Sequence, residues 1–312
     1  MNKIVIALLS IIALFGVTYV VLPNVTLFNY LVKAERSIAG LELEQIIVDD
    51  LHIEYLRGGK GEPLVLLHGF GADKDNWNRI ARHLSGNFEI IALDIPGFGN
   101  STKDIDLDYD VSSQVRRLNE ITAELGLTNF NLAGSSMGGY IAGNFAAQYP
   151  DKVNNLWLIS PFGVAKSQTS EMFAAVQNGE SPVVLARTDA EFTKLFNFLF
   201  VEPPFVPAPV INHLAAQASL SAELNSKIFE QIHRMENGQP HPDLPLDKVM
   251  KQYTGPVLIT WGQNDRVLHV SGAQVLKQII PQAQIDVMQN VGHLPMVEQP
   301  KISAESFVTF AQ

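Results

Sequence analysis

One ten-residue stretch, Asn131–Tyr140, constrains the fold of this chain more than any other. It reads NLAGSSMGGY and contains GSSMG at positions 134–138, which matches the pattern G-x-S-x-G. An apolar run before the pattern predicts a strand, and apolar residues at helical spacing after it predict a helix. Between a strand and a helix, the pattern places a serine on a sharp, strained turn with its hydroxyl exposed. We interpret Ser136 as a candidate nucleophile, and a chance turn of small residues is the alternative.

Short apolar runs alternate with helical patterns on both sides of this stretch. The expected strands cover residues 46–48, 53–56, 63–67, 88–93, 130–133, 153–159, 257–261 and 284–288. The expected helices cover residues 74–84, 109–125, 137–148, 267–280 and 298–310. Strands that alternate with helices predict an α/β protein with a mostly parallel sheet and helices on both of its faces.

The alternation stops at about residue 162 and resumes at residue 257. Residues 164–250 lack strand periodicity and carry helical segments. We therefore expect a core made of residues 44–163 and 251–312, interrupted by a helical cap over the carboxyl edge of the sheet. An N-terminal segment, residues 1–30, precedes this core and has a different character.

This N-terminal segment contains an uncharged apolar run at residues 4–22. At about 1.5 Å per residue, a helix of this length nearly spans a hydrocarbon core of roughly 30 Å. A cleaved signal peptide is the alternative, but its apolar part is usually about 7–15 residues and ends in a small-x-small site. Here the run ends in YVVL, so we predict an uncleaved single-pass anchor within residues 1–30.

The charges that flank the run predict its orientation. Lys3 on the short side favours an N-terminus that stays inside, with the catalytic domain outside the cytoplasm of a bacterial-type inner membrane. Lys33 and Arg36 on the far side weaken this prediction.

Composition excludes several classes of function. A net charge of −10 opposes binding to phosphate backbones, so we expect no nucleic-acid partner. The chain has no cysteine, which excludes disulfides, thiolate metal sites and cysteine nucleophiles. Carboxylates and histidines do not cluster at ligand spacing, and no phosphate-binding glycine loop is present, so we expect neither a metal nor a cofactor. The sequence does not predict an oligomeric state.

Several motifs together resemble those of the α/β-hydrolase superfamily. They are HGFG at 68–71, DIPGFG at 94–99, GSSMGG at 134–139, WGQNDRV at 261–267 and VGH at 291–293. The resemblance covers roughly residues 45–163 and 252–312. Within the superfamily the chain most resembles membrane-anchored monoacylglycerol lipases and related bacterial lipases and esterases. This implies an α/β-hydrolase fold with an eight-stranded sheet and a helical cap, and the hydrolysis of esters by a serine.

A serine hydroxyl becomes a nucleophile only when an adjacent base takes its proton. His293 follows the expected strand 284–288 and is the best-placed histidine. Asp265 follows the strand 257–261 and is expected to accept a hydrogen bond from His293. The order Ser136, Asp265, His293 is the one that this fold uses. The alternatives are a surface histidine and an aspartate that caps a helix.

An oxyanion hole completes such a site. The backbone N–H of Met137 lies at the start of a helix, where negative charge is favoured. The resemblance assigns a second N–H to Phe70 in the HGFG motif. His68 and Asp94 precede the nucleophile in the chain, so we expect His68 to hydrogen-bond loops and Asp94 to shape one.

The expected cap is rich in phenylalanine. Phe196, Phe198, Phe200 and Phe205 fall within ten residues, and such a surface suits acyl chains or a bilayer. Ordinary packing of the cap is the alternative. Together with Leu294, which follows the candidate histidine, these are our candidate substrate-binding residues. With an anchor that holds the domain at a membrane, lipid esters are the expected substrates.

The predicted function is therefore hydrolysis of carboxylic esters of acyl chains, above all monoacylglycerols, through a Ser-His-Asp triad and an acyl-enzyme. A C–C bond hydrolase of the ring-cleavage-product type is the alternative, although in that family a tryptophan tends to follow the catalytic histidine, and here Leu294 does. A non-catalytic ligand-binding protein of this fold is a third possibility, which the complete triad disfavours. Dehalogenases and the common epoxide hydrolases use an aspartate nucleophile, whereas cofactor-free haloperoxidase activity can accompany the same triad.

Overall fold

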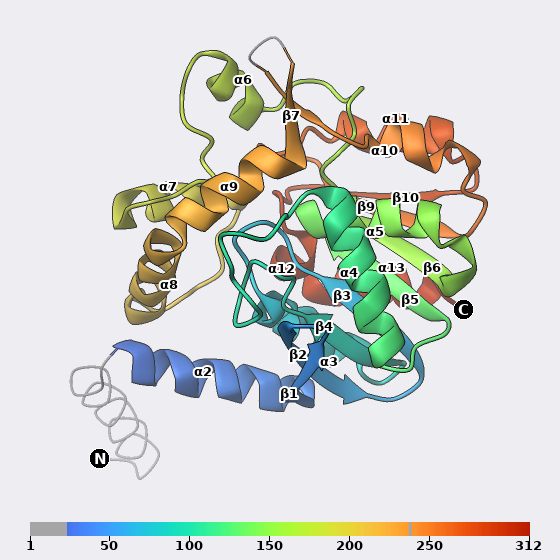
Figure 1. Cartoon of the computed structure of the whole chain (residues 1–312), viewed down its shortest axis with the longest axis horizontal. Coiled ribbons are helices and arrows are strands. Elements are labelled where there is room, and N and C mark those ends of the chain that lie inside the picture. Colours follow the sequence, from blue (N-terminus) through green and yellow to red (C-terminus); the bar gives the residue numbers. More distant parts are fainter. Residues whose placement is uncertain (1–23, 237–238) are drawn as a thin grey trace, which may run out of the picture.

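The fold is built on an eight-stranded sheet in a computed structural model that describes residues 24–236 and 239–312 (Figure 1). The strand order is β1-β2-β4-β3-β5-β6-β9-β10. β2 runs antiparallel to both of its neighbours, and the other pairs are parallel. The predicted α/β architecture with a mostly parallel sheet is confirmed.

The strands of the sheet are β1 (Leu41–Val48), β2 (Leu51–Gly59), β3 (Glu62–Leu67), β4 (Phe88–Leu93), β5 (Phe130–Ser135), β6 (Val153–Ile159), β9 (Val257–Gly262) and β10 (Gln284–Met288). The central strands β5 and β9 are buried along their whole length, and β3 is buried in its last four residues, because helices cover both faces of the sheet. β1 and β2 are longer than expected. In β1 only the last three residues, 46–48, form an apolar run, and the polar residues before them hid the first part of the strand.

Helices cover both faces of the sheet. One face carries α4 (Val111–Glu124), α5 (Met137–Gln148) and α11 (Ser271–Ile279), and the other carries α3 (Asn78–Leu84), α12 (Pro295–Glu298) and α13 (Pro300–Phe310) (Figure 1). Short helical turns lie at η1 (Lys74–Trp77), η2 (Pro150–Lys152), η3 (Met250–Gln252) and α10 (Leu246–Val249). The helix expected over 267–280 begins only at Ser271, and the one expected over 298–310 is broken before Pro300.

The cap consists of α6 (Glu171–Gln177), α7 (Asp189–Leu199), α8 (Ala208–Leu220), α9 (Ala222–Ile232) and a hairpin of β7 (His233–Glu236) and β8 (Gln239–Pro242). It lies at the carboxyl end of the parallel strands (Figure 1). The sequence did not predict this hairpin. The two strands have four residues each, which is too short for alternation to show in the sequence.

A further helix, α2 (Asn24–Ala39), links the cap to the core. Its Phe28 ring lies 4.2 Å from the ring of His213 in α8. Arg36 donates two hydrogen bonds to Asp75 at 2.7 and 2.6 Å. Across residues 24–236 and 239–312, no helix is both long and apolar enough to cross a membrane. The predicted anchor run, residues 4–22, lies outside the described residues.

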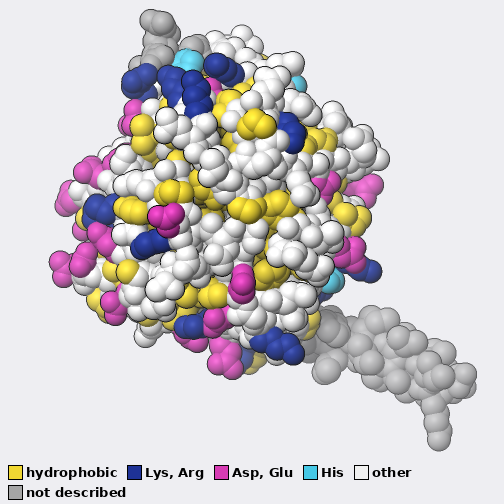
Figure 2. All heavy atoms as spheres, turned by 90° about the vertical axis from the view of Figure 1, so that its right-hand side faces the viewer, with side chains coloured by type: hydrophobic (Ala, Val, Ile, Leu, Met, Phe, Trp, Pro, Cys, Tyr) yellow, Lys and Arg dark blue, Asp and Glu magenta, His cyan; other side chains and the backbone are white. Residues whose placement is uncertain are grey.

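The surface on the β10 side carries no single large apolar patch. Figure 2 shows hydrophobic side chains scattered among uncharged ones on this face, with most of the acidic side chains towards its edges. This distribution agrees with the net charge of −10.

Candidate active site

The turn between β5 and α5 holds Ser136 in a strained backbone conformation, with φ 55° and ψ −117°. Non-glycine residues rarely adopt such angles, which cost of order 1–3 kcal/mol. Every residue from Phe130 to Ala146 is buried except Ser136, which is partly exposed. A Cβ at Gly134 would lie 2.2 Å from the Gly138 oxygen, so the turn requires glycine there. The strand, strained turn and helix predicted for this stretch are confirmed.

Neighbouring backbone groups hold this strained residue in place. The Ser136 N–H donates to the Ile159 oxygen at the end of β6 at 3.0 Å. The Ser136 oxygen accepts from the N–H groups of Tyr140 and Phe162, each at 3.0 Å. The conformation of Ser136 is therefore fixed by both its own helix and the loop after β6.

His293 and Asp265 form a hydrogen-bonded pair, as the sequence predicts. His293 Nδ1 lies 2.8 Å from Asp265 Oδ2, and both side chains are buried. Asp265 Oδ2 also accepts from Trp261 Nε1 at 3.0 Å, and Oδ1 accepts from the N–H groups of Val267 and Leu268 at 2.8 and 2.9 Å. Because a carboxylate only accepts, His293 Nδ1 carries the proton and Nε2 keeps its lone pair.

Residues 263–270 form a loop, and α11 begins only at Ser271. The bonds from Val267 and Leu268 to Asp265 have the pattern of a helix cap, but no helix follows directly.

The three candidate catalytic residues lie at one edge of the sheet. Ser136 follows β5, Asp265 follows β9 and His293 comes five residues after β10, and these strands run parallel. The carboxyl ends of parallel strands meet at a common edge, where α/β proteins place their sites. Among the hydrogen bonds of the described residues, none joins Ser136 Oγ to His293. Such catalytic contacts often tighten only when the substrate is bound.

The HGFG loop passes close to Ser136. A Cβ at Gly69 would lie only 3.3 Å from Ser136 Cβ. The next residue, Phe70, contacts the rings of Phe98 and Phe229 edge to face, at 5.5 and 6.0 Å between ring centroids. This places the candidate oxyanion loop between the nucleophile and the cap.

His68 fastens this loop to a second one. Its Nδ1 donates to the Gly69 oxygen at 2.7 Å, and its Nε2 accepts from the Ile95 N–H at 3.1 Å. Complete burial lowers the pKa of His68, which favours the neutral ring that these two bonds require. The sequence-based expectation that His68 hydrogen-bonds loops agrees with this geometry.

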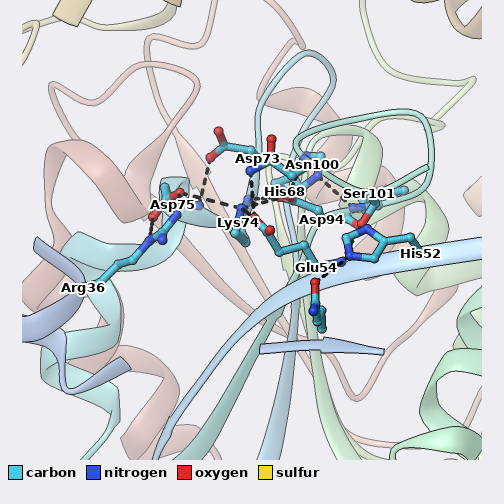
Figure 3. Close-up of polar contacts among 12 residues, drawn as sticks. Arg36, His52, Glu54, His68, Asp73, Lys74, Asp75, Asp94, Asn100 and Ser101 are labelled. Carbon is cyan, nitrogen blue, oxygen red and sulfur yellow. Dashed lines mark hydrogen bonds and ion pairs between the residues drawn. The ribbon is translucent and has the colours of Figure 1, made fainter. Parts of the chain in front are cut away.

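A buried cluster of charges supports the same region (Figure 3). Asp94 accepts from the Lys74 N–H at 2.7 Å, from Lys74 Nζ at 2.9 Å and from the Asn100 N–H at 2.7 Å. Lys74 Nζ also lies 2.7 Å from Glu54 Oε1. Burial lowers the pKa of Lys74, but Asp94 and Glu54 outweigh burial and leave it raised. Asp94 thus shapes its loop as expected, whereas the sequence did not reveal its partner Lys74.

The five candidate substrate-binding residues do not form one surface. Phe200 and Leu294 are buried in the same apolar cluster, with Phe196 packed edge to face on Phe200 at 5.2 Å. Phe198 lies under the guanidinium of Arg266 at 4.4 Å, and Phe205 is 88% exposed.

A groove of about 590 Å³ borders Asp265 but is not lined by Ser136. It is formed by the end of α7 and the loop after β9, with Arg266 and His269 in its wall. Its lining is mostly polar and does not resemble an acyl-chain site.

Two residues near the site were missed by sequence reasoning. Glu298 in α12 accepts hydrogen bonds from backbone N–H groups of both the cap and the histidine loop. His233 is buried among Phe162, Phe173 and Phe229, and its Nδ1 lies 2.6 Å from the Phe229 oxygen. Burial lowers the pKa of His233 to about 4. Neither residue belongs to a recognisable motif: His233 lies among polar and charged residues in FEQIHRME, and Glu298 is followed by Gln299.

Comparison with known proteins agrees with this fold. The family model for the alpha/beta hydrolase fold matches residues 62–300, and the chain belongs to this family. Lipase 1 of Psychrobacter immobilis is 34% identical over 295 residues, which cover 92% of this chain and 90% of that protein. Monoacylglycerol lipase ABHD6 of Homo sapiens is 28% identical over 287 residues, which cover 88% and 83% of the two chains.

A similar solved structure is that of a membrane phospholipase A described as a bacterial virulence factor. It superposes with a TM-score of 0.87 at 37% identity, over 99% of this chain and 98% of that one. The similarity thus extends over nearly the whole of both chains.

Proposed function

We propose that this chain cleaves carboxylic esters of acyl chains with Ser136 as nucleophile, His293 as general base and Asp265 as the residue that orients His293. The observation that carries the proposal is the 2.8 Å hydrogen bond between His293 and Asp265 at the sheet edge that also holds the strained Ser136. The broader class does not depend on these roles: the chain is an ester-hydrolysing enzyme, as its lipase, monoacylglycerol lipase and phospholipase relatives indicate.

The proposed reaction has two steps. Ser136 Oγ attacks the ester carbon while His293 Nε2 takes its proton, and the backbone N–H groups of Met137 and Phe70 stabilise the oxyanion. His293 then returns the proton to the leaving alcohol, which leaves an acyl group on Ser136. A water molecule, deprotonated by His293, attacks this acyl-enzyme and releases the carboxylic acid. Asp265 stays ionised and stabilises the charged imidazole in both steps.

Monoacylglycerols are the substrates that we propose. The support comes from the names of two groups of relatives, monoacylglycerol lipases and bacterial lipases, and from the aromatic cap. Phe200 and Leu294 are buried in one apolar cluster with Phe196 packed against it, and Leu294 directly follows His293, so we propose that the acyl chain binds against this cluster. The exposed Phe205 suits contact with a lipid surface.

The decisive experiment compares initial rates on monoacylglycerols of short to long chain, the matching triacylglycerols and p-nitrophenyl esters. Preference for medium or long monoacylglycerols would support the proposed substrate, whereas activity on short esters alone would reduce it to a carboxylesterase. Ser136→Ala should lower kcat by several orders of magnitude and leave the fold intact. Near-normal turnover by this variant would refute the triad. Reaction of Ser136 with a fluorophosphonate without any ester turnover would favour the C–C hydrolase.

We also propose that residues 1–30 contain a single-pass anchor that holds the catalytic domain outside the cytoplasm. The support is the uncharged run at residues 4–22 and the similarity to a membrane phospholipase. Since α2 begins at Asn24 and packs on the cap, the informative truncation removes residues 1–23. The truncated protein should leave the membrane fraction and keep its turnover of short esters. A truncated protein that stays in the membrane fraction would contradict the anchor.

A further inference from the structure

A short segment of the cap, residues 199–202, lies directly against the loop that carries His293. The His293 N–H donates to the Leu199 oxygen at 2.7 Å. A Cβ at Gly292 would lie 2.5 Å from the same oxygen and 3.0 Å from Phe200 Cα. The cap backbone and the histidine loop are therefore as close as two backbones can be, and only glycine fits at position 292.

One carboxylate joins these two segments. Glu298 Oε1 accepts from the Gly292 N–H at 2.5 Å. Its other oxygen accepts from the N–H groups of Val201 at 3.0 Å and Glu202 at 3.2 Å. Glu298 ends α12, the single turn that follows His293, so its side chain points back toward the loop that precedes it. Hydrogen bonds to an ionised acceptor are about twice as strong as neutral ones.

We propose that Glu298 is a positioning residue that fixes the direction of His293 and locks cap residues 199–202 to the histidine loop. Two consecutive N–H groups of that loop are held, that of Gly292 by Glu298 and that of His293 by Leu199. Asp265 fixes the rotation of the imidazole ring, whereas Glu298 fixes the backbone from which the ring projects. The inference rests on the proposed role of His293 as base.

This arrangement has a mechanical consequence. Any movement of residues 199–202 away from the core has to break the bonds to Glu298 and the bond to the His293 N–H. A cap detached at this point would leave His293 in a loop without its supports, and an error of about 1 Å in a reacting group can cost about 100-fold in rate. Substrate entry should therefore leave this part of the cap in place.

The test uses Glu298→Gln, which keeps the size of the side chain but replaces one acceptor oxygen by an N–H₂ donor. That donor would face an N–H group, so one side of the bridge is lost. The matched control is Glu305→Gln on α13, where the carboxylate is exposed and lies 3.8 Å from Lys301. Both changes remove one negative charge from the last part of the chain. Three quantities are measured in the full chain: kcat and KM on a short p-nitrophenyl ester, the labelling rate of Ser136 by a fluorophosphonate, and Tm.

Glu298→Gln should lower kcat and the labelling rate about 10- to 100-fold, with KM changed less than about threefold. Glu298→Asp, which keeps both oxygens on a shorter side chain, should recover part of the loss, and it replaces the Gln variant if that protein does not fold. Glu305→Gln should behave as wild type. A lower Tm with labelling and kcat within twofold of wild type, measured well below Tm, would show a purely structural role and overturn the inference. Wild-type protein that neither labels nor turns over esters would instead overturn the proposed function, and this inference with it.

Discussion

Replacing the strained serine by glycine should stabilise this protein while destroying its activity. Ser136 has φ 55° and ψ −117°, a conformation that costs a residue with a Cβ about 1–3 kcal/mol. Glycine adopts it freely but loses about 0.4–1 kcal/mol through the greater freedom of the unfolded chain. Ser136→Gly should therefore be more stable than Ser136→Ala by about 1–2 kcal/mol, because alanine keeps the strain and both variants lack the hydroxyl.

Thermal unfolding measures this difference directly. For a domain of this size about 1 kcal/mol corresponds to roughly 2–4 °C, so Tm of the glycine variant should exceed that of the alanine variant by about 2–8 °C. Both variants should lose ester turnover alike. The preceding residue provides a control of opposite sign. Ser135 lies in β5, is fully buried and has no left-handed φ, so Ser135→Gly should be less stable than Ser135→Ala.

The comparison can refute the argument in one step. If Ser136→Gly were equal to or less stable than Ser136→Ala, the turn would store no backbone strain at the nucleophile. If the glycine variant were more stable than the alanine variant at both positions, the difference would be a general effect of glycine and would not report on the conformation of Ser136.

Three further predictions concern the residues around the site. Asp265→Asn should lower kcat about 10³- to 10⁴-fold with little change in KM, because an amide no longer fixes the protonated Nδ1 of His293. Steady-state kinetics on a short ester test this prediction, and a loss in kcat below tenfold would contradict it. Burial lowers the pKa of His233 to about 4 from an ordinary value near 6.5, so the folded protein favours the neutral ring. The folded state is therefore fully stabilised above pH 6.5 and loses this stabilisation as the pH falls toward 4. Between pH 7.5 and 5 this loss is about 2 kcal/mol. Tm of His233→Gln should therefore fall less over that range than Tm of wild type, and equal falls in the two proteins would refute the lowered pKa of His233. Lys74→Met should destabilise the fold by about 3–5 kcal/mol in denaturant titrations, because Asp94 would stay buried without its cation, and a change below 1 kcal/mol would contradict this.

The sequence predicted the central strands and the turn at Ser136 well because both obey local rules. β4, β6 and β10 have the expected ends, and the last four residues of β4 and of β6 form a buried apolar run, as in strands covered on both faces. The hairpin of β7 and β8 was missed because four residues are too few to show a period. The late start of α11 was missed because residues 267–270 continue the apolar pattern of the helix although they belong to a loop.

In the candidate site, too, residues in local motifs were predicted and residues with distant partners were not. The motifs predicted the pair formed by Asp265 and His293, because each follows a recognisable strand at the expected place in the chain order. Lys74 and Glu298 were not predicted, because their partners are distant in the sequence: Glu298 bonds Val201 at a separation of 97 residues. A long-range contact of one side chain with backbone N–H groups leaves no pattern in either segment.

These unpredicted contacts explain how loops can hold a rigid site. Loops tend to be mobile because they bury few apolar groups, yet catalysis needs its groups placed to within a fraction of an ångström. Here each loop is tied by a polar group to a loop or helix elsewhere in the chain: His68 joins the HGFG loop to Ile95, Lys74 joins η1 to Asp94, and Glu298 joins the histidine loop to the cap. Each tie crosses between segments that come together only when the chain is folded. The precision of the site should therefore be lost together with the tertiary structure, and the strain at Ser136 can persist because the surrounding contacts overdetermine its conformation.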